Sequence, residues 1–311
     1  MADGLALIGE ALYLYWTSAL PLAVLLTSGA SMGTLVYVFL TNGRNPKLRV
    51  SLLTGLYALS IFFWLFVGVS LVLCVLQART VAYRTWGVQA AVAGAVLTAL
   101  AASISISIIV WRRAASGVLR RFMPGPLAEG QRWAQGYVDL LSEFESTKRP
   151  QVLRANRPEP LAMAVAGRSP TILLSRGLFE VLDRDELEST LSHEFMHLKH
   201  RDAEFKVFSH VFSRILFFDP FSKFFDPAVH REREYLADEM GGRSTGKPAT
   251  LAAALLKLAE RGEPPKAAWG LSIVGPAKGI FSRYPPLEER VHRLLLLSDL
   301  LDIRKAHSGN V

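Results

Sequence analysis

Two histidines four residues apart, in the run His193-Glu194-Phe195-Met196-His197, form the part of the chain best suited to chemistry. On a helix this spacing brings both imidazoles to one face, one turn apart, where together they can bind one Zn²⁺. Glu194 lies beside them rather than between them, so it can take a proton from a metal-activated water without being a ligand. A surface helix with two incidental histidines would carry the same motif, so residues elsewhere in the chain must show whether this one binds a metal.

A third ligand is available further along the chain. Glu234 lies 37 residues beyond His197, in a second helix-compatible stretch, and would complete a His₂Glu site that keeps one position open. Asp238, one turn later, can accept the spare N–H of a ligand histidine and fix its tautomer. Glu232 and Glu239 compete for the role of third ligand, but neither has an acidic residue four positions later.

The histidine pair needs a helix, and the sequence predicts where that helix begins. Asp183-x-x-Glu186 has the pattern of a capping box that opens a helix running to about residue 201. Upstream, proline and glycine separate three strand-like runs at 151–154, 161–166 and 171–174. Before these runs, a helical pattern places five apolar residues on one face: Trp133, Tyr137, Leu140, Leu141 and Phe144. Together these patterns predict an α+β domain, mostly helical with a small sheet.

The charges are distributed unevenly. The chain has 311 residues, 50% of them hydrophobic, with a mean hydropathy of +0.26. Residues 1–111 hold five basic and two acidic residues, whereas the rest holds 30 basic and 25 acidic ones. This distribution excludes a disordered protein and a simple soluble enzyme. The single cysteine, Cys74, excludes an intrachain disulfide and therefore a disulfide scaffold.

Three charge-free stretches, within 11–40 and at 51–76 and 86–111, are long enough to cross a bilayer as helices. The flanking Lys and Arg residues number seven on one side and two on the other, which places the N-terminus outside and the large C-terminal part in the cytoplasm. The net charge of +8 could suggest nucleic acid, but the basic residues at 112–121 lie next to a predicted span, so membrane orientation explains them better. We therefore expect a multi-pass protein of the cell membrane with no nucleic-acid partner.

Three segments carry a family resemblance. The run from Leu174 to Asp202, the segment Glu234–Asp238 and the segment Tyr284-Pro285-Pro286-Leu287-Glu288-Glu289-Arg290-Val291 resemble the HtpX and CAAX-prenyl-protease family of membrane-embedded zinc peptidases. The resemblance implies a gluzincin fold with one zinc ion per chain. It also implies that the edge strand within 161–167 binds an extended peptide through backbone hydrogen bonds, which assigns Ala162, Met163, Ala164 and Val165 to the substrate strand.

The sequence departs from this family in two places. Relatives usually have further membrane spans between the HExxH motif and the third ligand, but residues 203–233 include Lys206, Arg214 and Asp219, so a span there is implausible. Tyr284 stands where the family commonly has histidine. Tyr284 or Arg290 could donate to a developing oxyanion, or both could simply anchor the C-terminal helix.

The interval before the third ligand also resembles another group of proteases. Its short length and its paired prolines, Pro220 and Pro227, are similar to antibiotic-sensor proteases of the BlaR/MecR type. The phenylalanines between 205 and 225 could lie on the membrane surface, but such a stripe is more often core, and we expect core.

These observations predict three parts: a three-helix transmembrane region at 1–111, a juxtamembrane linker and helix at 112–150, and a zinc metallopeptidase domain at 151–311. The predicted activity is hydrolysis of peptide bonds in protein or peptide substrates, membrane proteins among them, in quality control or processing. A signalling sensor-protease and a non-enzymatic scaffold with a structural zinc are the alternatives. A structural site usually has four protein ligands, so an open site favours an enzyme. The sequence leaves the substrate and the oligomeric state open.

Overall fold

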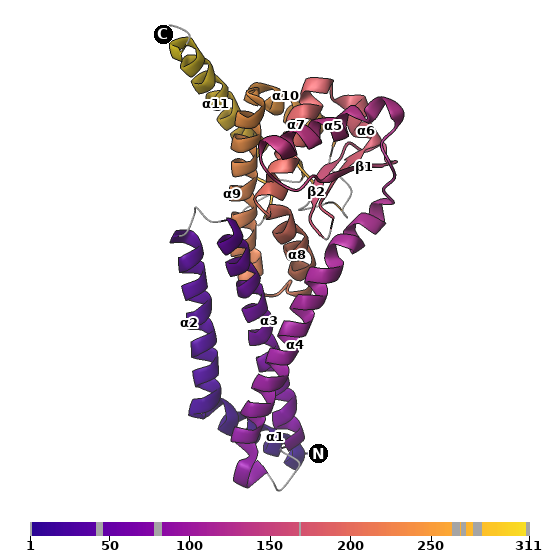
Figure 1. Ribbon diagram of the computed structural model, residues 1–311. Helices are drawn as coiled ribbons and strands as arrows, with labels where there is room; N and C mark the ends of the chain where they lie inside the picture. The colour runs from indigo at the N-terminus through magenta and orange to yellow at the C-terminus, as the bar shows by residue number, and fades with distance from the viewer. Residues whose placement is uncertain are drawn as a thin grey trace. The chain divides into compact units, whose positions relative to one another are not determined.

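A computed structural model describes residues 2–41, 46–77, 83–167, 169–262, 268, 272–275 and 282–308. The chain divides into two compact units, Met1–Trp111 and Arg112–Val311, and each is described by itself (Figure 1). The segment 112–150, which the sequence predicts as a linker and helix, is part of the second unit.

The first unit is entirely helical in its described part. It contains α1 (Ala2–Thr17), α2 (Ala19–Thr41), α3 (Pro46–Gln77) and most of α4 (Tyr83–Phe122). Three stretches are long and apolar enough to span a bilayer, Ala19–Thr41, Ser51–Leu76 and Gln89–Val110, which confirms the predicted three spans and a membrane protein. The first predicted stretch is split between two helices. A bend at Ser18 separates α1 from α2, so residues 11–17 belong to α1.

Small and polar side chains hold the helices of this unit together. Ala91, Ala95 and Ala99 follow one another on one face of α4 and are fully buried, so the backbone of a neighbouring helix can approach closely. The Tyr15 hydroxyl donates to Ser70 Oγ at 2.7 Å and joins α1 to α3. The Ser103 hydroxyl donates to the Ala58 carbonyl at 2.6 Å and joins α4 to α3.

The second unit contains the predicted small sheet. Its strands are β1 (Gln151–Ala155), β2 (Ala162–Val165) and β3 (Thr171–Ser175), in the order β1-β3-β2, with β1 parallel and β2 antiparallel to β3. All three strands coincide closely with the predicted runs. The strand β2 therefore lies at an edge of this sheet, as the family resemblance implies.

Helices make up the rest of the unit. A 3-10 turn (Glu129–Gln131) and α5 (Trp133–Phe144) precede the sheet, and α6 (Arg176–Val181), α7 (Arg184–Lys199), α8 (Asp202–Ile215), α9 (Pro220–Thr245), α10 (Pro248–Glu260) and α11 (Leu287–Ser308) follow it (Figure 1). The helix that carries the histidines, α7, packs against α9, α10 and the sheet. It forms the centre of the unit.

The capping box at the start of α7 is formed as predicted. The Asp183 carboxylate accepts the N–H of Glu186 at 2.9 Å, and the Glu186 carboxylate accepts the N–H of Asp183 at 3.0 Å. Beyond the cap, Leu187, Leu191 and Phe195 are buried in the main apolar cluster. The helix ends at Lys199, two residues before the predicted end, because Arg201 adopts a left-handed backbone conformation (φ 62°) that starts α8.

The predicted apolar face of α5 is partly wrong. Leu140 and Phe144 are 68% and 82% exposed, whereas Ala134 and Val138 face the core. Gln135 explains this rotation of the helix, since its side chain accepts the N–H of Val152 at 2.7 Å and donates to the Pro150 carbonyl at 3.0 Å. These two bonds hold one face of α5 on the start of β1.

Among the phenylalanines of 205–225 whose side chains the structure describes, some lie in the core and some on the surface; the side chains of Phe208, Phe221, Phe224 and Phe225 lie outside the described part. Phe205 and Phe212 on α8 are buried, as expected for core residues. Phe217 and Phe218, in the turn before α9, are 69% and 45% exposed, so the core prediction is wrong for them. A turn at the end of a short helix leaves its side chains little to pack against. In place of a membrane span, 203–233 form the charged helix α8 and the first half of α9.

Candidate metal centre

The histidine pair and Glu234 meet at one point. His193 and His197 lie on successive turns of α7, Glu234 faces them from α9, and all three side chains are buried. The two Nε2 atoms are 3.2 Å apart; Glu234 Oε2 lies 3.4 Å from the Nε2 of His193, and Glu234 Oε1 lies 3.4 Å from the Nε2 of His197. A tetrahedral zinc ion with bonds of about 2.0–2.1 Å separates its ligand atoms by about 3.3–3.4 Å. With a different oxygen of Glu234 facing each nitrogen, the three side chains are close to the spacing that such an ion requires.

Glu194 adds a second argument that the site fits a divalent metal. Its side chain is fully buried, and within the described part of the chain neither carboxylate oxygen makes a close hydrogen bond, although the backbone N–H of Ala164 on β2 lies near enough to lower the pKa of Glu194. A buried carboxylate without close partners is costly unless a cation or an ordered water balances it. The donor set of two imidazoles and a carboxylate, next to this carboxylate, fits a metal ion that activates water.

The pKa shifts of two of the three ligand side chains suit metal binding, whereas for His193 the effect of burial is outweighed by the contacts with Asp238 and Glu234, which raise the pKa. Burial, and then the charge of Lys206, lowers the pKa of His197 well below its usual value, which leaves its imidazole neutral. Burial alone would raise the pKa of Glu234, but the charge of Lys206 and the hydrogen bonds from the two histidines outweigh it and hold that pKa well below the usual range. A neutral imidazole and an ionised carboxylate are the forms that bind a metal ion.

The pKa of Glu194 moves in the opposite direction. Burial raises it, and the nearby charges of Lys206 and His193 only partly oppose that rise. A carboxylate with a raised pKa takes up a proton more readily, which is the property of a general base.

Asp238 contacts His193 at Nδ1, the ring nitrogen that is not the metal ligand, and Arg290 in turn contacts Asp238. His193 Nδ1 lies 3.0 Å from Asp238 Oδ1, so its Nε2 points to the other two ligands. Arg290 on α11 donates to both oxygens of Asp238 at 2.7 Å and, through Nη1, to the Ile273 carbonyl at 2.6 Å. All of these side chains are buried. Arg290 Nη2 also lies 3.6 Å from Glu234 Oε2, so its guanidinium contacts both acidic side chains of the centre.

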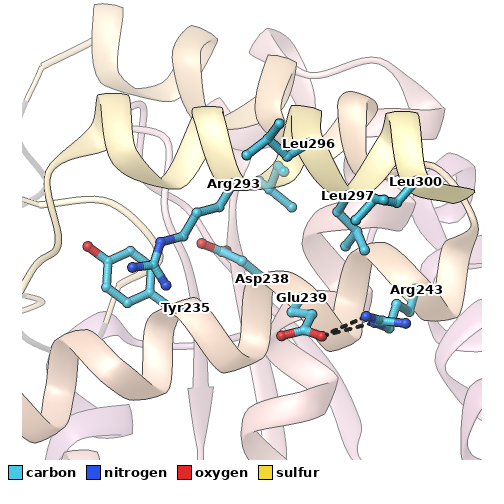
Figure 2. A pocket seen from close by; sticks show the side chains of 9 residues that line it. Tyr235, Asp238, Glu239, Arg243, Arg293, Leu296, Leu297 and Leu300 are labelled. Carbon is cyan, nitrogen blue, oxygen red and sulfur yellow. Dashed lines mark hydrogen bonds and ion pairs between the residues drawn. The ribbon is translucent and has the colours of Figure 1, made fainter.

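Figure 2 shows Asp238 between α9 and α11. A pocket of about 260 Å³ lies there, with Leu296, Leu297 and Leu300 of α11 along one wall. The pair Glu239–Arg243, 2.8 Å apart, closes one side. Since Asp238 also contacts His193, this pocket adjoins the back of the metal centre rather than its open side.

Tyr284 lies in the segment before α11 and is buried. Its hydroxyl makes a long hydrogen bond of 3.5 Å to the Ala268 carbonyl, and its ring lies so close to Gly275 that a Cβ there would be 2.2 Å from it. The contacts of Tyr284 thus anchor the segment that precedes α11, which is the second of the two roles the sequence leaves open.

The predicted substrate strand lies beside α7. Ala164 on β2 packs with Ala203 and Leu198, which lie just after the histidine motif. The Ala162 carbonyl accepts the N–H of Ile273 at 3.2 Å, so it points away from β3. Since successive residues of a strand alternate in direction, the N–H and C=O of Ala164 also point outward, whereas Met163 and Val165 face β3. The outward groups of Ala164 are therefore placed at the edge.

Sequence reasoning missed two residues of the centre, Lys206 and Gly241. Lys206 on α8 is buried, and its Nζ lies 2.5 Å from Glu234 Oε1. Gly241 on α9 lies against α7, where an added Cβ would be 3.1 Å from the Cα and the backbone nitrogen of His193. A glycine in mid-helix, three residues after Asp238, is a signal that could have found Gly241. Nothing in the sequence distinguishes Lys206 from a surface lysine.

We expect Gly241→Ala to destabilise the protein by up to about 2 kcal/mol and to weaken metal binding. Alanine gains about 1 kcal/mol of helix propensity, but its methyl group would push against the backbone of α7, and overpacking of this kind costs about 1–3 kcal/mol. Gly136→Ala on α5 is the matched control, since nothing lies within 4 Å of its added Cβ, and it should be neutral or stabilising. Thermal unfolding of both variants in detergent checks this, and equal midpoints would contradict the close contact.

A second buried polar cluster is structural. Ser209 donates to Asp226 Oδ1 at 2.8 Å and lies 2.7 Å from His230 Nε2, while Arg283 Nε donates to Asp226 Oδ2 at 2.8 Å. Burial is the main cause that lowers the pKa of His230 to about 3. The same serine hydroxyl contacts both the acid and the histidine, so the three do not form the relay of a serine hydrolase. The cluster joins α8, α9 and the segment before α11.

Comparisons with known proteins agree with this site. Residues 134–276 match the family described as BlaR1 peptidase M56. Three curated relatives share the name Protease HtpX homolog. Those of Pyrococcus abyssi and Pyrococcus furiosus are 31% and 32% identical over 206 residues, which cover 50% of this chain and 70% of each relative. That of Pelotomaculum thermopropionicum is 32% identical over 222 residues, 54% of this chain and 77% of the relative.

The matched family region includes both histidines and Glu234, and the membrane-spanning helices lie outside it. The identities, the coverage of the relatives and the three apolar helices agree with one another. The chain therefore belongs to the HtpX family of membrane metallopeptidases.

Proposed function

We propose that the protein is a zinc-dependent endopeptidase that cleaves peptide bonds in protein substrates at the membrane. The observation that carries this proposal is the meeting of His193, His197 and Glu234, with nitrogen–nitrogen and nitrogen–oxygen distances of 3.2–3.4 Å and the buried carboxylate of Glu194 next to them. When bound, zinc would lower the pKa of a water and polarise the scissile carbonyl.

Each residue of the centre has its own role in the proposed reaction. His193, His197 and Glu234 hold the ion, and Asp238 holds His193 in the tautomer whose Nε2 faces the ion. Glu194 takes the proton from the attacking water and later passes it to the leaving amine. Arg290 fixes Asp238 through two hydrogen bonds of 2.7 Å. A single buried base next to the metal ligands thus serves both proton transfers.

The substrate would bind as an added strand on β2. The outward C=O of Ala164 can pair with the backbone of an extended peptide, which gives affinity without demanding a particular side chain. The N–H of Ala164 lies next to the Glu194 carboxylate and would have to leave it before it could donate to a substrate. Ile273 already occupies the Ala162 carbonyl at 3.2 Å, so the free edge begins beyond that residue. This arrangement favours extended or unfolded segments of proteins as substrates.

The proposal is tested on the purified full-length chain in detergent with casein as substrate. We expect about one zinc per chain, cleavage that phenanthroline abolishes, and recovery of cleavage when zinc is restored. Cleavage that persists after the metal has been removed would refute a metal-dependent mechanism. Full metal content with no cleavage of any unfolded protein would instead favour a zinc-containing scaffold.

The support around His193 yields a separate expectation. Asp238→Asn should weaken zinc binding by about 10–100-fold, because a neutral amide is a poorer acceptor for the His193 N–H and leaves Arg290 without its counter-charge. Glu239→Gln, one residue later and exposed, is the matched control and should bind zinc like the parent. Chelator competition measures both affinities. An Asp238→Asn affinity within twofold of the parent would contradict the positioning role.

We infer that the N-terminus lies outside and the peptidase domain in the cytoplasm, which the distribution of Lys and Arg supports. Single cysteines at Glu10 or at Lys148, in a chain where serine replaces Cys74, test this orientation with an impermeant maleimide on intact cells. Only the Glu10 position should react before lysis, and labelling of Lys148 alone would reverse the orientation.

The match to BlaR1 peptidase M56 favours a second candidate function, a sensor-protease that cuts itself or one partner. Such a protein would show a self-cleavage band that disappears in the Glu194→Gln variant. Such a protein would leave casein intact, whereas a general protease would degrade casein.

A further inference from the structure

Lys206 is the one feature of the metal centre that the proposed mechanism does not use. Its side chain is 1% exposed, although it comes from α8 and not from the two helices that supply the ligands. Lysine is rarely buried to this degree unless it is paired. Its Nζ lies 2.5 Å from Glu234 Oε1 and 2.9 Å from His197 Nε2. One ammonium group therefore contacts two of the three metal-ligand side chains.

The contact with His197 has a chemical consequence. Lysine ammonium can only donate, so the imidazole nitrogen at 2.9 Å must be the acceptor. An imidazole nitrogen has a single lone pair, and coordination of a metal through Nε2 uses the same lone pair. The hydrogen bond from Lys206 and a metal bond at His197 Nε2 therefore exclude each other.

The contact with Glu234 does not have this restriction. A carboxylate has two oxygens with several acceptor positions, so Lys206 can stay on Oε1 while Oε2 binds an ion. The ammonium would then remain close to the ion, and two positive charges in a buried site repel each other more strongly than in water. Both effects act against metal binding.

We propose that Lys206 is a positioning residue that competes with the metal for His197 and so sets the metal affinity of the centre. Zinc enters only when the ammonium leaves His197 Nε2, and the ammonium then remains paired with Glu234. This inference rests on the proposed function, because it needs zinc at His193, His197 and Glu234. It makes the binding of zinc weaker, and therefore more easily reversed, than the three ligands alone would.

Lys206→Met tests the proposal by direct zinc affinity of the full-length protein in detergent. We expect zinc to bind at least about 10-fold more tightly than to the parent, because the competing cation is gone. In the presence of EDTA the variant should unfold at a lower temperature than the parent, since Glu234 loses its buried partner. Added zinc should raise the unfolding temperature of the variant more than that of the parent.

Two further variants complete the experiment. Lys223→Met, at an exposed position of α9, is the matched control and should leave zinc affinity unchanged. Lys206→Gln keeps a donor without the charge and serves if the methionine variant does not fold. Zinc affinity that is unchanged or weaker in the foldable Lys206 variant would overturn the inference. If the parent itself binds no zinc that depends on His193, the proposed function fails instead, and the two failures are distinguishable.

Discussion

Glu194→Gln should retain zinc and lose between about 10²- and 10⁴-fold of its peptide cleavage rate. Glutamine has nearly the shape of glutamate, so the buried space beside the ligands stays filled, but an amide cannot take a proton from water. Because Glu194 contributes no ligand atom to the three-residue site, the metal content should equal that of the parent. Casein cleavage and zinc per chain, measured on the same sample, check both parts of this expectation.

A matched control exists on the same helix. Glu188 forms a surface pair with Arg184 at 3.1 Å, and Glu188→Gln should cleave casein at the parental rate. Parental cleavage by purified Glu194→Gln protein would exclude Glu194 as the base. Loss of zinc together with activity would show that Glu194 acts in holding the metal.

The second large effect is expected for His193→Ala. Removing one of three ligands should reduce zinc to a small fraction of one per chain and cleavage to the level of the chelated parent, because two remaining ligands rarely hold zinc. Asp238 would also lose its contact with Nδ1, which lies 3.0 Å away. Zinc analysis after gel filtration measures the loss, and casein cleavage measures its consequence.

His292→Ala on the exposed side of α11 provides the control and should keep both zinc and activity. The comparison separates loss of a ligand from a general effect of removing histidine. A His193→Ala protein with full zinc content would place the metal elsewhere.

Local patterns account for what the sequence predicts well. The charge-free stretches, the capping box at Asp183 and Glu186, and the strand runs each depend on neighbouring residues, and the structure contains all of them. The four-residue spacing of the histidines is likewise a property of a single helix. The contact of Glu234 with this pair could be predicted because few residue types can act as the third ligand of a zinc site.

Contacts between distant segments explain what the sequence could not predict. The rotation of α5 depends on Gln135, whose partners lie at the start of β1. Arg290 reaches Asp238 across 52 positions of the chain, and this contact decides that its guanidinium faces inward. The burial of Lys206 depends on how α8 packs against α9, which no local pattern encodes.

X-ray absorption at the zinc edge, on the purified full-length chain, tests the central claim most directly. We expect one zinc bound by two imidazole nitrogens and by oxygen at about 2.0–2.1 Å, with no sulfur ligand. In Glu234→Ala protein the zinc signal should be lost. A zinc ion with sulfur ligands, or an unchanged spectrum in Glu234→Ala protein, would contradict the assignment of the metal to His193, His197 and Glu234.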